Sequence, residues 1–82
     1  MRLDKYLKVS RIIKRRTVAN EACDAGKVIV NGKITRASYD VKEGDVLDLQ
    51  LGVRSIKVKV TTVLEFVRKE NAGEMYEVIS EE

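Results

Sequence analysis

The dipeptide Asn31-Gly32 constrains the fold of this chain more than any other short segment. It follows the apolar run Val28-Ile29-Val30 and is followed by Lys33. A two-residue turn of type I′ needs positive φ at both central residues, and Asn-Gly adopts that conformation at little cost. The segment therefore predicts a tight β-turn that closes a hairpin.

Further strands are expected downstream of the hairpin. Each is a short run in which apolar residues cluster or alternate with polar ones between turn-forming segments. The expected strands are residues 46–50, 56–60, 63–67 and 76–79. Turn-like sequences at 43–45 and 69–73 separate them from their neighbours.

The N-terminal residues 2–8 fit an amphipathic helix. At about 100° of rotation per residue, the apolar side chains share one arc and the basic side chains share roughly the opposite one. The apolar arc holds Leu3, Tyr6 and Leu7, and the basic arc holds Arg2, Lys5 and Lys8. This helix is expected to dock through one face and to present charge on the other. Residues 9–16 then form a connection anchored in the core by its two isoleucines.

A second helix is predicted from Thr17, a plausible N-cap, to Gly26, which can adopt the left-handed conformation that ends a helix. Its apolar side is expected to consist of Val18, Ala19, Ala22, Cys23 and Ala25. Its exposed side is expected to consist of Asn20, Glu21 and Asp24. The fold class that follows is α+β, with two N-terminal helices packed on a small, mainly antiparallel sheet.

The length of 82 residues allows one domain, which we expect to span residues 1–82. The composition, 44% hydrophobic and 35% charged, is that of a globular chain rather than a disordered tail. Basic residues interrupt the N-terminus, so no segment there predicts a signal peptide or a membrane span. With Cys23 as the single cysteine, no internal disulfide can form, and a cytoplasmic location is expected.

Charge is distributed unevenly along the chain. Residues 1–36 hold ten Lys or Arg against three Asp or Glu, a formal charge of +7, whereas residues 37–82 hold six against ten, a charge of −4. A dense basic segment of this kind is typical of a surface that binds a polyanion. The N-terminal part is therefore expected to carry an RNA-binding face.

Arginine is the informative residue type in that segment, because its planar guanidinium matches phosphate oxygens with two parallel hydrogen bonds. The candidate RNA-binding residues are Arg2, Lys5, Arg11, Arg15 and Arg16. Asp4 lies among them, and we expect it to orient neighbouring arginines rather than to touch RNA. A first-turn acid stabilised by the helix dipole is an equally good explanation of Asp4.

Enzymatic chemistry is poorly provided for. The chain has no histidine, which is the commonest general base and metal ligand. Cys23 falls on an apolar helix face and fits a small buried hydrophobic residue. The carboxylates at 40, 43, 45 and 48 flank a turn and a strand, where turn formation explains them. We therefore expect a protein that is not an enzyme and that needs no cofactor or metal.

Four separated signatures resemble the RNA-binding domain of ribosomal protein S-four, also called the alpha-L RNA-binding motif. They are residues 2–7, Arg16-Thr17 with Ala19, residues 26–33, and Val41 with residues 44–47. The match covers residues 1 to 50, which leaves 51–82 as a C-terminal strand extension. The free-standing form, opening with RLDKYLKVSRIIKRRT, resembles the RqcP family, relatives of the fifteen-kilodalton bacterial heat-shock RNA-binding protein.

The resemblance implies an adaptor of the large ribosomal subunit. Such a protein would bind 23S rRNA and tRNA on subunits that carry a stranded peptidyl-tRNA, and would support C-terminal alanine tailing in ribosome-associated quality control. Its expected protein partner is the alanine-tailing factor. It would act as a monomer and would not associate with a membrane.

Two alternatives belong to other functional classes. One is an accessory domain or subunit of an enzyme that modifies rRNA or tRNA. The other is a DNA-binding regulator that reads a duplex with the second helix. The DNA alternative is disfavoured because Glu21 and Asp24 on that helix would repel the backbone of a duplex.

Overall fold

The computed structural model describes residues 1–64 and 75–81. In this part of the chain, two helices precede a sheet whose neighbouring strands are all antiparallel, in the order β2-β1-β3-β4-β5. The elements are α1 (Leu3–Val9), α2 (Arg16–Asp24), β1 (Val28–Val30), β2 (Lys33–Ile34), β3 (Val46–Leu51), β4 (Arg54–Val60) and β5 (Tyr76–Glu81). The α+β class and the antiparallel sheet are confirmed.

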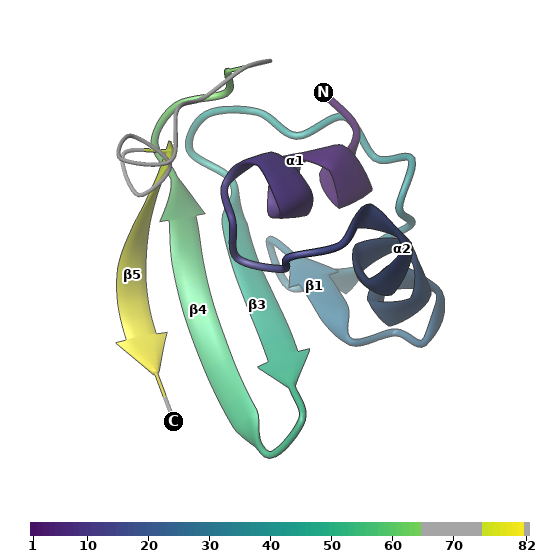
Figure 1. Cartoon of the computed structure of the whole chain (residues 1–82). Coiled ribbons are helices and arrows are strands. Elements are labelled where there is room, and N and C mark those ends of the chain that lie inside the picture. Colours follow the sequence, from purple (N-terminus) through teal and green to yellow (C-terminus); the bar gives the residue numbers. More distant parts are fainter. Residues whose placement is uncertain (65–74, 82) are drawn as a thin grey trace.

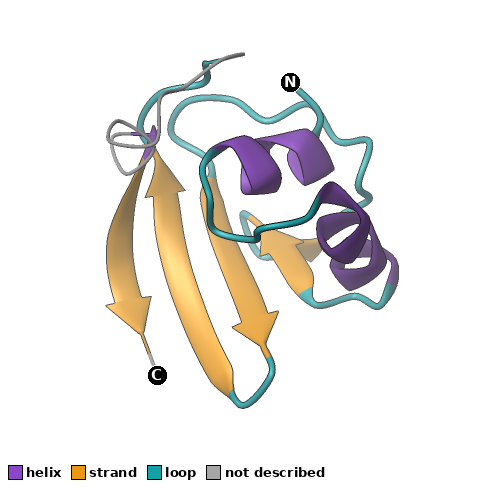
Figure 2. Ribbon diagram, viewed as in Figure 1, coloured by secondary structure: helices purple, strands orange, loops and turns teal. Residues whose placement is uncertain are grey.

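Both helices lie on the same side of the sheet, near β1 and β3, and the β3–β4 hairpin extends beyond them (Figure 1). The loop between β2 and β3 runs past the N-terminus and the start of α1 (Figure 2). The hydrophobic core lies between the helices and the sheet, and its completely buried side chains include Leu3, Tyr6, Leu47 and Leu49.

The Asn31-Gly32 turn is confirmed. It joins β1 to β2 with Val30 paired to Lys33, and both turn residues have positive φ, 51° at Asn31 and 84° at Gly32. The Asn31 side chain adds two contacts to the loop that precedes β3: it accepts from the Val46 N–H at 2.9 Å and donates to Asp45 at 3.0 Å. The turn is therefore held both by local backbone preference and by the next strand.

Replacing Gly32 with valine should lower the free energy of unfolding by about 1 kcal/mol or more, because a β-branched residue is strained at positive φ. No heavy atom beyond its chain neighbours lies within 4 Å of the Cβ that the substitution adds, so backbone strain is the expected cause. Chemical denaturation would measure the loss. Gly32→Asn is the matched control, since asparagine tolerates this conformation better, and equal stability of the two variants would contradict the explanation.

The first helix runs from Leu3 to Val9, one residue later than predicted, and its apolar arc is confirmed, whereas Lys5 of the basic arc is half-buried. Leu3, Tyr6 and Leu7 are completely buried, and Lys8 is exposed. Tyr6 also donates its hydroxyl to the Met75 carbonyl oxygen at 2.8 Å, which ties α1 to the segment that leads into β5. The connection after α1 is irregular, as expected, and is anchored by the buried Ile13 and the partly buried Ile12.

Three details predicted for the second helix are wrong. The helix begins at Arg16 rather than after Thr17, because the Arg15 carbonyl oxygen already accepts from the Ala19 N–H and closes the first turn. Arg15 is therefore the N-cap, and its side chain makes no capping hydrogen bond. Of the expected apolar side, only Ala19 and Cys23 are buried, and Val18 and Ala25 are exposed, since the helix packs along a narrow stripe. Asn20 is half-buried rather than exposed.

The strands expected at 46–50, 56–60 and 76–79 are confirmed as β3, β4 and β5. The strand expected at 63–67 is not formed at residues 63 and 64. The N–H groups of the preceding Thr61 and Thr62 both donate to the Met75 carbonyl oxygen, which does not continue a ladder. The rest of the expected strand lies outside the described residues. The turn expected at 69–73 also lies outside them. Among the described helices, none has the length and apolar character needed to cross a bilayer.

Candidate nucleic-acid interface

The start of α1 is positioned by backbone contacts with the loop between β2 and β3. The Leu3 N–H donates to the Tyr39 carbonyl at 2.8 Å, and the Asp4 N–H donates to the Ala37 carbonyl at 3.2 Å. These bonds occupy N–H groups that the first turn of a helix cannot satisfy internally. They also place Arg2 and Asp4 beside the loop and beside α2.

That loop is itself braced by a buried carboxylate, Asp45. Its oxygens accept from the Tyr39 hydroxyl at 2.8 Å, from the Lys42 N–H at 3.0 Å and from Asn31 at 3.0 Å. Burial opposes ionisation of Asp45, but these hydrogen bonds outweigh it, so its pKa lies below the ordinary value. The expected turn-forming role is confirmed for this residue, and Tyr39 is engaged with it.

A second buried carboxylate, Asp4, accepts hydrogen bonds from the start of α1 and from α2. The Asp4 cluster consists of Asp4 with the Arg2, Arg16 and Asn20 side chains and the Lys5 N–H. Arg2 Nε lies 3.2 Å from Oδ1, Arg16 Nε lies 3.4 Å from Oδ2, Asn20 donates to Oδ2 at 3.3 Å, and the Lys5 N–H donates to Oδ1 at 2.8 Å. The cluster joins α1 to α2.

The Asp4 carboxylate is held in its charged form. Desolvation raises its pKa, but hydrogen bonds from Asn20, the Lys5 N–H, Arg16 and Arg2 lower the pKa by a larger amount. The net pKa is therefore below the ordinary value. Its side chain is 3% exposed, whereas those of Arg2 and Arg16 are 51% and 46% exposed. One edge of each guanidinium thus faces the buried acid, and the rest faces solvent, where it can bind a phosphate.

The other sequence-predicted residues are arranged around this cluster. Lys5 is half-buried on α1, and its backbone belongs to the cluster. Arg11 is exposed on the connection and has a left-handed backbone, with φ of 64°. Arg15 is exposed at the N-cap of α2, directly before Arg16. The structure thus brings Arg2 and Arg16 together on Asp4 and leaves Arg11 and Arg15 on the segment that leads into α2.

Two residues on this face were not selected from the sequence. Asn20 was expected to be a solvent-exposed helix residue, but it reaches Asp4. Arg36 lies in the loop after β2 and lines a hollow together with Arg2. The charge count of residues 1–36 includes Arg36, but Arg36 is 34 positions from Arg2, so no local pattern predicts that the two line one hollow.

Cys23 has the ordinary role that its helix face predicted. It is 3% exposed, and burial, with the nearby charges of Asp4 and Asp24, raises the pKa of its thiol to about 11. A thiol with such a pKa is protonated at neutral pH and is a poor nucleophile.

A sequence model of the S4 domain matches residues 1–47. The chain belongs to the S4-domain family. This S4-domain protein is 54% identical over 82 residues to the RQC P-site tRNA stabilizing factor of Halalkalibacterium halodurans, a match that covers 100% of this chain and 93% of the relative. It is 52% identical over 81 residues to the factor of the same name from Streptococcus pneumoniae, covering 99% and 92%. The resemblance inferred from the sequence is confirmed.

A solved structure supports the same assignment of this S4-domain protein. The trimeric structure of Vibrio cholerae heat shock protein 15 superposes with a TM-score of 0.91 at 27% sequence identity, covering 98% of this chain and 82% of that one. The shared fold extends beyond the matched residues 1–47 into the later strands, since almost the whole chain is covered.

Proposed function

We propose that this S4-domain protein binds RNA through the face centred on the Asp4 cluster, and that its ligands are tRNA and 23S rRNA on large ribosomal subunits that carry a stranded peptidyl-tRNA. The observation that carries the proposal is the pair of half-exposed arginines, Arg2 and Arg16, that both contact one buried carboxylate. Fixed guanidinium groups lose less side-chain entropy when they bind phosphates than free ones do.

The relatives support the biological setting. Those named above carry the name RQC P-site tRNA stabilizing factor and match this chain over nearly its whole length. By extension, the protein holds the tRNA on obstructed subunits while the alanine-tailing factor extends the stalled nascent chain. We propose that it acts in the cytoplasm, as a monomer and without catalysing a reaction itself.

We further propose that residues 1–82 act as a single RNA-binding domain, with the motif core in 1–50 and a strand extension in 51–82. Pairing of β3 with β4 along its whole length supports this view, because the two parts share one sheet. The alternative of an accessory domain of an RNA-modifying enzyme has no comparable support, since the relatives named above bear a different name.

Co-sedimentation with large subunits tests the proposal. Arg16→Ala should weaken association by about tenfold or more, since a hydrogen bond between charged groups contributes on the order of 1.5–3 kcal/mol. Lys57→Ala is the control, because Lys57 is an exposed basic residue on β4, outside the Asp4 cluster. Equal losses from the two substitutions would show that binding does not reside on the proposed face.

The partner can be tested in the same preparation. Bound subunits should contain peptidyl-tRNA and the alanine-tailing factor. Stable co-purification with an RNA-modifying enzyme instead would favour the alternative function.

A further inference from the structure

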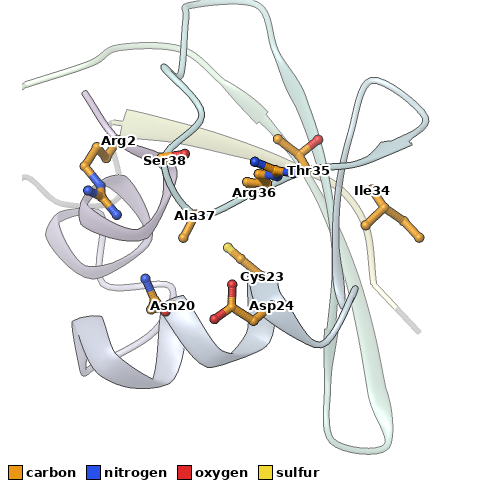
Figure 3. A pocket seen from close by; sticks show the side chains of 9 residues that line it. All are labelled: Arg2, Asn20, Cys23, Asp24, Ile34, Thr35, Arg36, Ala37 and Ser38. Carbon is orange, nitrogen blue, oxygen red and sulfur yellow. The ribbon is translucent and has the colours of Figure 1, made fainter.

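A hollow of about 580 Å³ lies beside the Asp4 cluster, between α2 and the loop after β2. We call it the α2–loop hollow. Its lining residues are Arg2, Asn20, Cys23, Asp24, Ile34, Thr35, Arg36, Ala37 and Ser38. In Figure 3, Asn20, Cys23 and Asp24 point from α2 toward the loop segment that carries Ala37. Its volume lies in the range of roughly 300–1,000 Å³ that is usual for pockets that hold small molecules.

Two small uncharged residues, Cys23 and Ala37, lie among the lining of the hollow. Cys23 is 3% exposed and Ala37 is 5% exposed, so both present small, buried surfaces. The Cys23 thiol is neutral at physiological pH, as shown above. Uncharged groups at this position suit the flat face of a nucleobase better than a phosphate.

The α2 wall presents hydrogen-bond acceptors. Asp24 contributes an exposed carboxylate. The Asn20 amide N–H donates to Asp4 Oδ2, and Oδ1 is the atom of this amide group that can accept a hydrogen bond. The opposite wall carries the Thr35 and Ser38 hydroxyls, and Thr35 Oγ1 donates to the Lys33 carbonyl at 2.8 Å.

Two arginines, Arg2 and Arg36, complete the lining. Both are exposed, and Arg2 also belongs to the Asp4 cluster. A nucleotide in the hollow would therefore have basic groups nearby for its own phosphates, while its base faced the carboxylate of Asp24.

From this arrangement we propose that the α2–loop hollow binds one unpaired nucleotide of the RNA, with guanosine preferred and Asp24 as the residue that reads the base. Guanine alone presents two adjacent donors, N1–H and the N2 amino group, which match the two oxygens of a carboxylate. Unpaired bases splayed out of a loop are the usual targets of sequence-specific RNA recognition. The inference rests on the proposed function, because it needs RNA on this face.

The sign of one mutational effect separates this role from simple repulsion. A carboxylate on a phosphate-binding face weakens RNA binding, so removing its charge should strengthen binding to every RNA alike. Removing a carboxylate that reads guanine should weaken binding to the RNA that carries guanine. Glu21 is the matched control, since it is an exposed acid on the same helix that lines a different hollow, with Val18 and Gln50.

The probes are four RNA hairpins that share one stem and differ in a single unpaired loop base. The unmodified protein should bind the guanine hairpin about tenfold more tightly than the uracil hairpin, which corresponds to about 1.4 kcal/mol. Asp24→Asn should abolish the preference, and Glu21→Gln should keep it. Asp24 is exposed in the last turn of α2, where an acid is unfavourable, so its replacement should not unfold the protein.

Equal affinity of the unmodified protein for the four hairpins, or no binding to any of them, overturns the proposal. So does an Asp24→Asn variant that binds all four more tightly and keeps the same ranking. Arg16→Ala distinguishes the two levels: if it weakens all four complexes while Asp24→Asn leaves the preference intact, only the base-reading role fails. If Arg16→Ala has no effect on any complex, the RNA-binding face itself is wrong.

Discussion

Replacing Asp4 with asparagine is expected to lower the free energy of unfolding by about 1–3 kcal/mol, and to weaken RNA binding by about tenfold or more. The Asp4 side chain is only 3% exposed, and its carboxylate accepts hydrogen bonds from four residues. An amide in its place would turn an NH2 group toward some of those donors and leave Arg2 and Arg16 without their anchor. The stability figure is kept low because both arginines are about half exposed, where solvent screens the ion pairs.

The comparison variant is Asp48→Asn, a half-buried acid on β3 that is not part of the cluster. It should change stability and affinity little. Unfolding by denaturant and binding to a ribosomal RNA fragment would be measured on both variants at a temperature where both are folded. An unchanged affinity of the Asp4→Asn variant would show that the cluster does not orient the binding arginines.

The pH dependence of stability gives a second signature of the same carboxylate. The pKa of Asp4 in the folded protein lies below its ordinary value of 3.8, so the folded state binds fewer protons than the unfolded state as the pH approaches that value. The stabilisation is fully present above the unfolded-state pKa and is lost as the pH falls through the folded-state pKa. The stability difference between the unmodified protein and Asp4→Asn should therefore shrink below about pH 4. A difference that stayed constant to strongly acid pH would contradict this account of the cluster.

Salt should have a still larger effect on binding. If the face centred on the Asp4 cluster neutralises about four to six phosphates, the logarithm of the association constant should fall against the logarithm of salt concentration with a slope of roughly −3 to −5. Raising the salt from about 50 to 200 mM would then weaken the complex by about 60-fold to 1,000-fold. The physical cause is that each arginine or lysine bound to a phosphate releases a counterion into solution.

Substitution of a single phosphate-binding residue should reduce the magnitude of that slope. Arg2→Ala or Arg16→Ala should reduce it by about one, with a similar loss of affinity for different RNA sequences, because phosphate contacts carry no base identity. Lys57→Ala should leave the slope unchanged. Titrations with a fluorescent RNA at several salt concentrations would provide these values, and a slope near zero would mean that apolar contacts or a protein partner dominate binding.

Features governed by neighbouring residues were predictable from the sequence. The Asn31-Gly32 turn was predicted because positive φ at both positions is a property of the dipeptide, and the buried arc of α1 was predicted because Leu3, Tyr6 and Leu7 recur at helical spacing. The predicted Thr17 cap was wrong although the residue type was suitable. The N-cap is the residue at which the connection turns into the helix, and the first helical turn already closes on the Arg15 carbonyl oxygen.

The candidate site was only half predictable. The five basic residues and Asp4 could be selected from charge density and residue type, and the signatures that they share with the S4 domain pointed to RNA. Which of them meet was decided by packing: Asp4 contacts Arg16 and Asn20, 12 and 16 residues further along the chain. The way in which α1 packs against α2 sets those contacts, and no local sequence pattern predicts that packing.

The sequence by itself therefore determined the hairpin, the amphipathic first helix and the basic character of the N-terminal part, since each depends on residues a few positions apart. The tertiary structure alone decided that Asp4 is buried, that Tyr6 reaches the carbonyl of Met75, and that Arg36 shares a hollow with Arg2. The physical reason is that backbone preferences act over short segments, whereas burial and the pairing of distant side chains depend on how the helices and the sheet pack together.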